Sequence, residues 1–242
     1  MIDAMYSDSR DRASFSATPA LMMPRYGKLP EIEVGHVRFL VGRGGIYVES
    51  RSYAVHGCLQ IASAQQLPFG DVQPFFHTQG GPIPQSLRQE LLRQARAALP
   101  NEYAALVLWQ NGEYRLHTPK VLSASPHRIH YSTADFDPLE VVIDVHSHGV
   151  GPAFFSGTDN QDDLASPMLL FQAMVMGRLD REVHEEVARM VINGRSAVRL
   201  DELADRLDAP RRGHVALEMV GVDDLIEGLM CSGVPVALID PY

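Results

Sequence analysis

The alternation of apolar and polar positions divides the first third of the chain into stretches of different character. Residues 1–24 are polar and serine-rich without a sustained period, which predicts a mobile N-terminal arm. Residues 34–61 hold short runs of β-branched and aromatic residues between glycines, a pattern typical of two or three antiparallel strands. Residues 62–82, with repeated proline and glycine, are expected to form a loop. Residues 25–82 are therefore predicted to be a β-rich extension that needs a neighbouring domain, because so few strands make no stable core alone.

The next stretch has the pattern of a helix followed by a sheet. Residues 84–99 carry apolar positions at helical spacing between two prolines. A second helix is predicted near residues 157–165. Strand patterns occur at residues 103–109, 113–117, 128–132, 139–146, 171–176, 187–192 and 195–200. This order predicts an α/β sandwich around a mainly antiparallel or mixed sheet, and not a doubly wound parallel sheet. We assign residues 83–200 to this domain and residues 201–242 to a helical C-terminal tail.

Composition and charge limit the classes of partner. The chain has 242 residues, of which 45% are hydrophobic, so it is long enough and apolar enough to build a core. Its formal net charge of −9 gives no electrostatic reason to expect a nucleic acid, because phosphate binding depends on clustered lysine and arginine. Protein or peptide partners are expected instead.

Cysteine usage and hydropathy indicate a reducing, aqueous compartment. Cys58 and Cys231 are far apart and have none of the spacings of a disulfide framework or a thiolate zinc site. The most apolar stretch, residues 167–176, is too short to span a bilayer, and the N-terminus has no apolar signal segment. We expect a cytoplasmic protein without membrane contact.

The stretch with the clearest chemistry lies at the end of a predicted strand. His146 and His148 are two residues apart, so their imidazoles point the same way while Ser147 faces the other side. Asp159 can add a carboxylate from the start of the following helix. Two imidazoles and one carboxylate, with a fourth position for water, are the donors of a catalytic zinc site, so one zinc per chain is predicted. The alternative is a chance pair of histidines followed by an ordinary helix cap at Ser156.

These residues resemble the signature of the JAB/MPN (JAMM) metalloproteases, which cleave ubiquitin-like proteins from lysines or trim their tails. The matching run is His146-Ser-His148, seven residues, and then Ser156-Gly-Thr-Asp159. The resemblance implies a JAB/MPN-like (cytidine-deaminase-like) α/β sandwich and a zinc-dependent peptidase or isopeptidase. It also implies that Glu102, directly after the first helix, is the general base, and that Ser156 stabilises the oxyanion.

A narrower resemblance links the chain to the A proteins of the bacterial PRTRC plasmid system. It is carried by residues 23–30, 99–102, 121–126 and 148–163. It implies a ubiquitin-like protein as substrate and an activating-enzyme-like protein as a further partner. Gly149 departs from the wider superfamily, in which proline commonly follows the second histidine. The alternative function is a JAB-fold module that binds zinc or a modifier without hydrolysis.

Other polar and aromatic residues have weaker claims to a role. Asp144 shares a strand face with His146 and could orient its imidazole, or could face a neighbouring hairpin. Asp162 and Asp163 fall in the first part of the predicted helix, where negative charge is favourable. Phe154 and Phe155 lie inside the loop between the ligands and could pack there or line a substrate channel. The histidines without ligand spacing, read as structural or solvated, are His117, His127, His130, His184 and His214.

Overall fold

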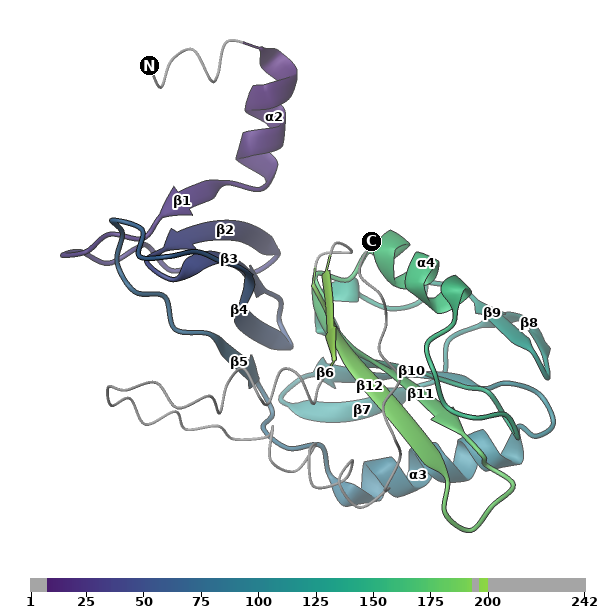
Figure 1. The fold of residues 1–242 in the computed structure, drawn as a ribbon. Coiled ribbons are helices and arrows are strands. Elements are labelled where there is room, and N and C mark those ends of the chain that lie inside the picture. The colour runs from purple at the N-terminus through teal and green to yellow at the C-terminus, as the bar shows by residue number, and fades with distance from the viewer. Residues whose placement is uncertain (1–7, 193–195, 200–242) are drawn as a thin grey trace.

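The computed structural model describes residues 8–192 and 196–199 (Figure 1). Within these ranges the strands form a five-stranded sheet, a six-stranded sheet and a two-stranded hairpin. The expected tail at residues 201–242 lies outside the described residues, and so does His214. Among the helices of the described ranges, none has the length and apolar content that crossing a bilayer requires.

The five-stranded N-terminal sheet has its strands in chain order, β1 to β5. The patterns at residues 34–61 correctly predicted its three central strands, which pair antiparallel. Gly45 begins one of them with φ +146°, and a Cβ there would lie 2.0 Å from the carbonyl oxygen of Ala62, so only glycine fits. The strands are β1 (Ala20–Met22), β2 (His36–Gly42), β3 (Gly45–Arg51), β4 (Val55–Ser63) and β5 (Phe75–Thr78).

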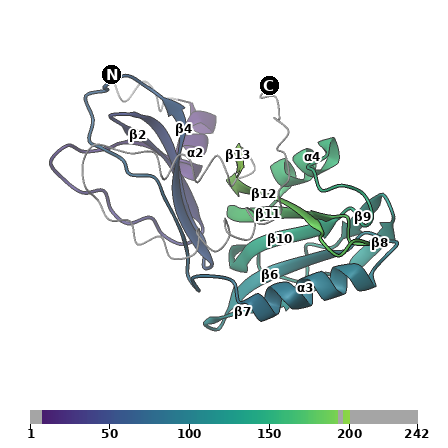
Figure 2. The same ribbon diagram turned by 60° about the horizontal axis from the view of Figure 1, so that its bottom comes forward.

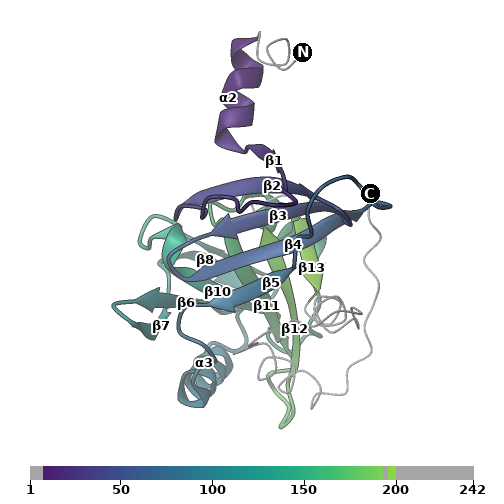
Figure 3. The same ribbon diagram turned by 90° about the vertical axis from the view of Figure 1, so that its left-hand side faces the viewer.

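The structure adds to one expectation for this region and corrects another. The predicted mobile arm contains helix α2 (Ser9–Ala17), capped by Asp8, and strand β1. The predicted loop at residues 62–82 contains β5. Both strands pair along edges of the sheet, β1 parallel to β2 and β5 antiparallel to β4. Backbone pairing along an exposed sheet edge needs little side-chain pattern, which is why the sequence did not indicate them. Figure 3 shows α2 extending away from the sheet.

The six-stranded sheet carries the second half of the described chain. Its order is β13-β12-β11-β10-β6-β7, and only the central pair β10–β11 is parallel in the described part, so the predicted mixed sheet is confirmed. A hairpin of β8 (Val121–Ser125) and β9 (Arg128–Tyr131) stands beside it. The sheet strands are β6 (Ala104–Gln110), β7 (Glu113–His117), β10 (Val141–Ser147), β11 (Leu170–Gly177), β12 (Glu185–Ile192) and β13 (Ser196–Arg199).

Helices lie on opposite faces of the six-stranded sheet (Figure 2). Helix α3 (Gln85–Ala97), which confirms the helix predicted over residues 84–99, buries Leu91 and Ala95 in one apolar cluster. Alternate residues of each strand face the other side, where α4 (Gly157–Ala165) lies. A 3-10 turn at Pro138–Glu140 leads into β10. The sandwich predicted from the order of elements is consistent with this layering.

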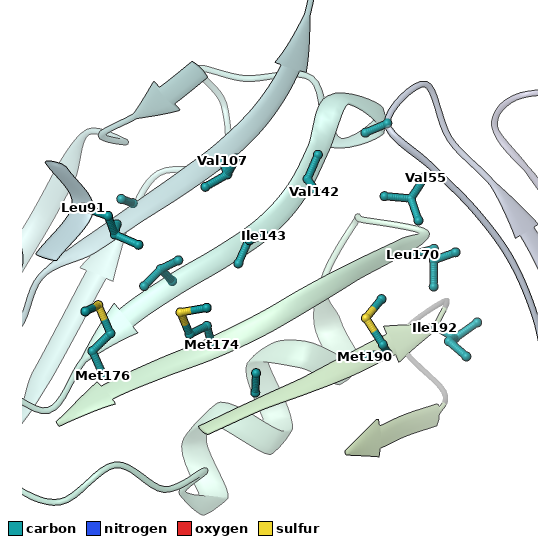
Figure 4. Packing of buried hydrophobic residues seen from close by; sticks show 14 of the residues in the cluster. Val55, Leu91, Val107, Val142, Ile143, Leu170, Met174, Met176, Met190 and Ile192 are labelled. Carbon is teal, nitrogen blue, oxygen red and sulfur yellow. The ribbon is translucent and has the colours of Figure 1, made fainter. Parts of the chain in front are cut away.

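The N-terminal sheet packs on the same face of the six-stranded sheet as α3 does. Val55 and Leu59 belong to one continuous core cluster with Leu170, Met190 and other residues of the large sheet (Figure 4). Gly57 allows this close approach, since a Cβ there would lie 2.9 Å from the side chain of Leu170. The opposite face of the large sheet, on which α4 lies, has a smaller apolar cluster that includes Leu106 and Phe171.

Candidate metal centre

Strand β10 presents two histidines at its C-terminal end. The strand is held between β6 and β11, so its backbone is fixed on both sides. The imidazoles of His146 and His148 lie on the α4 side with ring centroids 5.3 Å apart. Ser147, between them, points to the opposite face and is fully buried. The two-residue period of a strand therefore produces the predicted pair.

The third residue of the predicted set comes from α4. Asp159 Oδ1 lies 3.1 Å from His146 Nε2, and its Oδ2 lies 3.9 Å from His148 Nε2. One ligand atom from each of the three residues can be chosen so that all lie within 4.8 Å of one another. The structure thus brings together His146, His148 and Asp159, as the sequence predicted.

Hydrogen bonding at this cluster fits a bound metal ion. His146 Nε2 is buried and faces the Asp159 carboxylate, with Oδ1 3.1 Å away. His148 Nδ1 lies 3.2 Å from the carbonyl oxygen of Pro152, which can accept its proton and leave the Nε2 lone pair facing the site. Ligand atoms of a tetrahedral zinc lie about 3.4 Å apart, a value between the two measured contacts to Asp159.

The pKa values of the three residues are shifted by burial and by the charged groups around them. Burial lowers the pKa of His146, but Asp159, Asp144 and Glu102 raise it more, and the net direction is upward. Burial and the neighbouring His146 lower the pKa of His148. Burial raises the pKa of Asp159, but its contacts with His146 and with Ser156 reverse the direction, so this carboxyl stays ionised. The acidic groups that raise the pKa of His146 would also favour a bound divalent cation.

Ser156 is the N-cap of α4. Its hydroxyl oxygen accepts a hydrogen bond from the amide of Asp159 at 3.3 Å, and its own amide donates to Asp159 Oδ2 at 2.5 Å. This capping box fixes the carboxylate of Asp159 at the start of the helix. The cap that stood as the ordinary alternative is therefore present, and an oxyanion role of Ser156 stays a prediction.

Glu102 lies just before β6 and is buried. Its amide donates to the carbonyl of Ser125 in the β8–β9 hairpin, and its carboxyl takes part in a hydrogen bond with the backbone of Ile129. Burial raises the pKa of Glu102, His146 opposes that increase, and Asp159 adds to it. The Glu102 carboxyl thus interacts electrostatically with His146 and Asp159. A buried carboxylate with a raised pKa is suited to accept a proton.

Ser147 contributes a contact that the sequence did not reveal. Its hydroxyl accepts a hydrogen bond from the amide of Tyr103 at 2.9 Å, and its amide donates to the carbonyl of Tyr103 at 2.9 Å. These two bonds tie the strand of the histidines to the residue that follows Glu102. The only sequence signal was the small polar residue at the inward position of the His-Ser-His run.

The weaker candidates are placed as follows. Asp144 faces the hairpin: Tyr131 donates its hydroxyl to the Asp144 carboxyl at 2.8 Å, and burial raises the pKa of that carboxyl to about 6. Phe154 packs edge-on against His148, with centroids 4.7 Å apart, and half of it stays exposed. Phe155 instead lies under the guanidinium of Arg189.

The remaining histidines lie apart from the cluster. His117 is near Asp135, and His184 is near Glu186, each with an acidic neighbour of its own. His127 is at the turn of the β8–β9 hairpin, close enough to lower the pKa of Glu102. His130 lies on β9 and is exposed. The structure adds none of them to the His146, His148 and Asp159 group within the described residues.

Comparison with protein families agrees with this geometry. Residues 84–197 match the family model described as prokaryotic homologs of the JAB domain. This segment is JAB-like. The match supports the JAB/MPN superfamily that the motif indicated, and it spans the helix, the sheet and all the predicted site residues. Residues 8–77 match a separate model, described as a domain of unknown function, DUF2016.

The two remaining comparisons, with curated proteins and with solved structures, do not identify a fold or a function. A search of curated proteins gives no match. A solution structure of protein DSY2949 from Desulfitobacterium hafniense is similar at 20% identity, covering 45% of this chain and 82% of that one. The TM-score of 0.34 is too low to indicate a shared fold.

Proposed function

We propose that this chain is a zinc-dependent peptidase or isopeptidase that hydrolyses an amide bond. The observation that carries the proposal is the convergence of His146, His148 and Asp159, which offer one ligand atom each within 4.8 Å of one another. The JAB-like domain around it makes hydrolysis of a peptide or isopeptide the matching chemistry.

Each residue then has a definite task. Zinc held by His146, His148 and Asp159 would supply a water of lowered pKa and polarise the scissile carbonyl. Glu102 accepts a proton from the attacking water, whose oxygen bonds to the carbonyl carbon. When the carbon–nitrogen bond breaks, Glu102 returns the proton to the leaving amine. The Ser156 hydroxyl oxygen already accepts from an amide, so its proton remains available to donate to the oxyanion.

The substrate we propose is the C-terminus of a ubiquitin-like modifier or its conjugate, in a bacterial PRTRC-type system. The resemblance of residues 148–163 to the A proteins of that system supports this choice, as does an acidic chain without a nucleic-acid-binding charge pattern. An activating-enzyme-like protein of the same system would be a further partner.

The test combines metal content with cleavage. Protein purified without added metal should contain about one zinc per chain, and should cleave a reporter peptide fused to the C-terminus of a ubiquitin-like protein encoded nearby. Glu102→Gln should keep the zinc and slow cleavage at least about a hundredfold, the usual contribution of a positioned base. Glu90→Gln, on the exposed side of α3, is the matched control and should cleave normally.

Three results separate the possibilities. Wild-type protein without zinc would refute the metal site. A Glu102→Gln variant as active as wild type would refute the assigned base. Zinc-loaded wild type that binds the modifier but cleaves neither it nor its conjugates would favour a JAB-fold binding module over an enzyme.

A further inference from the structure

The two kinds of metal ligand are held in very different ways. His146 and His148 extend from a strand that is paired on both sides, whereas Asp159 is carried by α4. Helix α4 is nine residues long, and none of these described residues is buried. A helix this short is marginal by itself and usually depends on an apolar face packed against its neighbours. The position of α4 therefore depends on polar contacts.

One side chain of the large sheet contacts α4 at two of its residues. Arg189, on β12, is buried with only 3% of its surface exposed. Its Nη1 donates to Asn160 Oδ1 at 2.6 Å, and its Nε donates to Asp163 Oδ2 at 2.8 Å. Its Cζ lies 3.8 Å from the ring centroid of Phe155. The guanidinium thus contacts three residues around Asp159. They are Phe155 just before the N-cap, the neighbouring Asn160, and Asp163 one helical turn after Asp159.

We propose that Arg189 is a positioning residue for the metal centre, which places Asp159 opposite the two histidines by fixing α4 to β12. This inference rests on the proposed zinc site. The planar guanidinium fixes direction as well as distance, because its donors diverge in a rigid fork toward Asn160 and Asp163. Asp159 is adjacent to Asn160 and one helical turn before Asp163, so both contacts flank the ligand.

A purely structural role would look different, and the chain contains a matched case. Arg38 on β2 donates from Nε to Glu49 Oε2 at 2.7 Å, in a pair about as buried as that of Arg189 and Asp163. That pair lies in the N-terminal sheet, away from α4. Loss of either pair should cost folding stability, but only loss of the Arg189 pair should change how tightly the metal is held.

The experiment measures zinc affinity by competition with a chelator in the full chain. Arg189→Lys keeps the positive charge but cannot reach both Asn160 and Asp163, and Asp163→Ala removes the link from the helix side. Each should weaken zinc binding about ten- to a hundredfold, the usual effect of losing a contact that orients a ligand. Their double variant should be little worse than either single one, because both break the same link. Arg38→Lys should bind zinc as wild type does.

A second readout does not depend on the metal. In zinc-free protein, backbone amides of α4 should exchange hydrogen faster in Arg189→Lys and Asp163→Ala than in wild type, while those of β10 stay protected. If both variants fold and bind zinc with wild-type affinity, the positioning role is wrong while the zinc site stands. If wild type itself binds no zinc, the proposed function fails. Hydrogen exchange then still tests the role of Arg189: if the amides of α4 exchange at the same rate in the variants as in wild type, Arg189 does not hold the helix.

Discussion

Each of the two sheets contains a cluster of histidine and carboxylate with little exposure to solvent, and the clusters differ in how they are satisfied. In the N-terminal sheet, Glu49 accepts from Arg38 at one oxygen and contacts His56 Nε2 at 3.0 Å with the other. In the six-stranded sheet, the Asp159 carboxylate instead faces two imidazoles, with His146 Nε2 at 3.1 Å and His148 Nε2 at 3.9 Å. Similar residue types therefore have different roles in the two sheets. A cluster whose carboxylate is satisfied by an arginine stabilises the fold, whereas a carboxylate that faces two imidazoles, with the three ligand atoms within 4.8 Å of one another, is suited to a metal ion.

The largest effect expected from this comparison is the loss of metal. His146→Ala combined with His148→Ala should bring zinc close to zero per chain, because one carboxylate cannot hold the ion alone. His56→Ala, in the satisfied cluster, should leave zinc content unchanged. Elemental analysis of the purified variants decides, and full zinc retention in the double variant would remove the distinction between the two clusters.

Removing only the anionic ligand should have the next largest effect. Asp159→Asn should weaken zinc binding by at least about a hundredfold. Loss of a residue that only orients a metal ligand lowers metal affinity about ten- to a hundredfold, and Asp159 is itself a proposed ligand. Asp162→Asn, an exposed residue of the same helix, is the control. Equal zinc affinities of the two variants, measured by chelator competition, would contradict the assignment of Asp159.

The satisfied cluster should respond in stability instead. Glu49→Ala leaves Arg38 largely buried without its partner, and should lower the free energy of unfolding by about 3 kcal/mol. Chemical denaturation of zinc-free protein measures this, and zinc affinity of the folded variant should equal that of wild type. A change in zinc affinity larger than the change in stability would mean that the N-terminal sheet affects the site.

The smallest predicted effect is a pH dependence. Burial raises the pKa of Glu49, but hydrogen bonds from His56 and Arg38 reverse this and hold it below the ordinary value. Because the folded pKa is lowered, the contribution of Glu49 is fully present above the unfolded pKa of about 4.3 and is lost as pH falls through the folded pKa. Zinc-free wild type should thus lose more stability than Glu49→Gln on acidification from pH 6 to pH 3.5. Parallel losses in the two proteins would show that Glu49 carries no such contribution.

The sequence predicted the parts of the fold that have a strong local pattern. The helix with apolar residues Leu91 and Ala95 at four-residue spacing, and the strands at residues 103–109 and 113–117, appear as expected. The strands β1 and β5 were missed, because they rest on backbone pairing at an edge and carry little alternation. The strand β8 was missed for a related reason: most of its side chains are exposed, and its register is irregular.

The candidate site was likewise predictable where local pattern places a residue, and not where long-range contacts do. His146, His148 and Asp159 could be chosen from their spacing, since a strand period and a helix start place them by local geometry. Arg189 could not be chosen, because its contacts with Asn160 and Asp163 join positions 26 or more residues apart. No short-range signal marks such a partner.

By itself, the sequence determined which residues can form a metal site and on which elements they stand. Strand alternation sends two imidazoles to one side, and the cap at Ser156 sets the start of the helix that bears Asp159. Only the tertiary structure decided that the helix docks beside the strand, that Arg189 holds it there, and that the Asp159 carboxylate faces His146 Nε2. The reason is physical: local spacing fixes directions within one element, whereas distances between elements depend on packing and buried polar contacts across the fold.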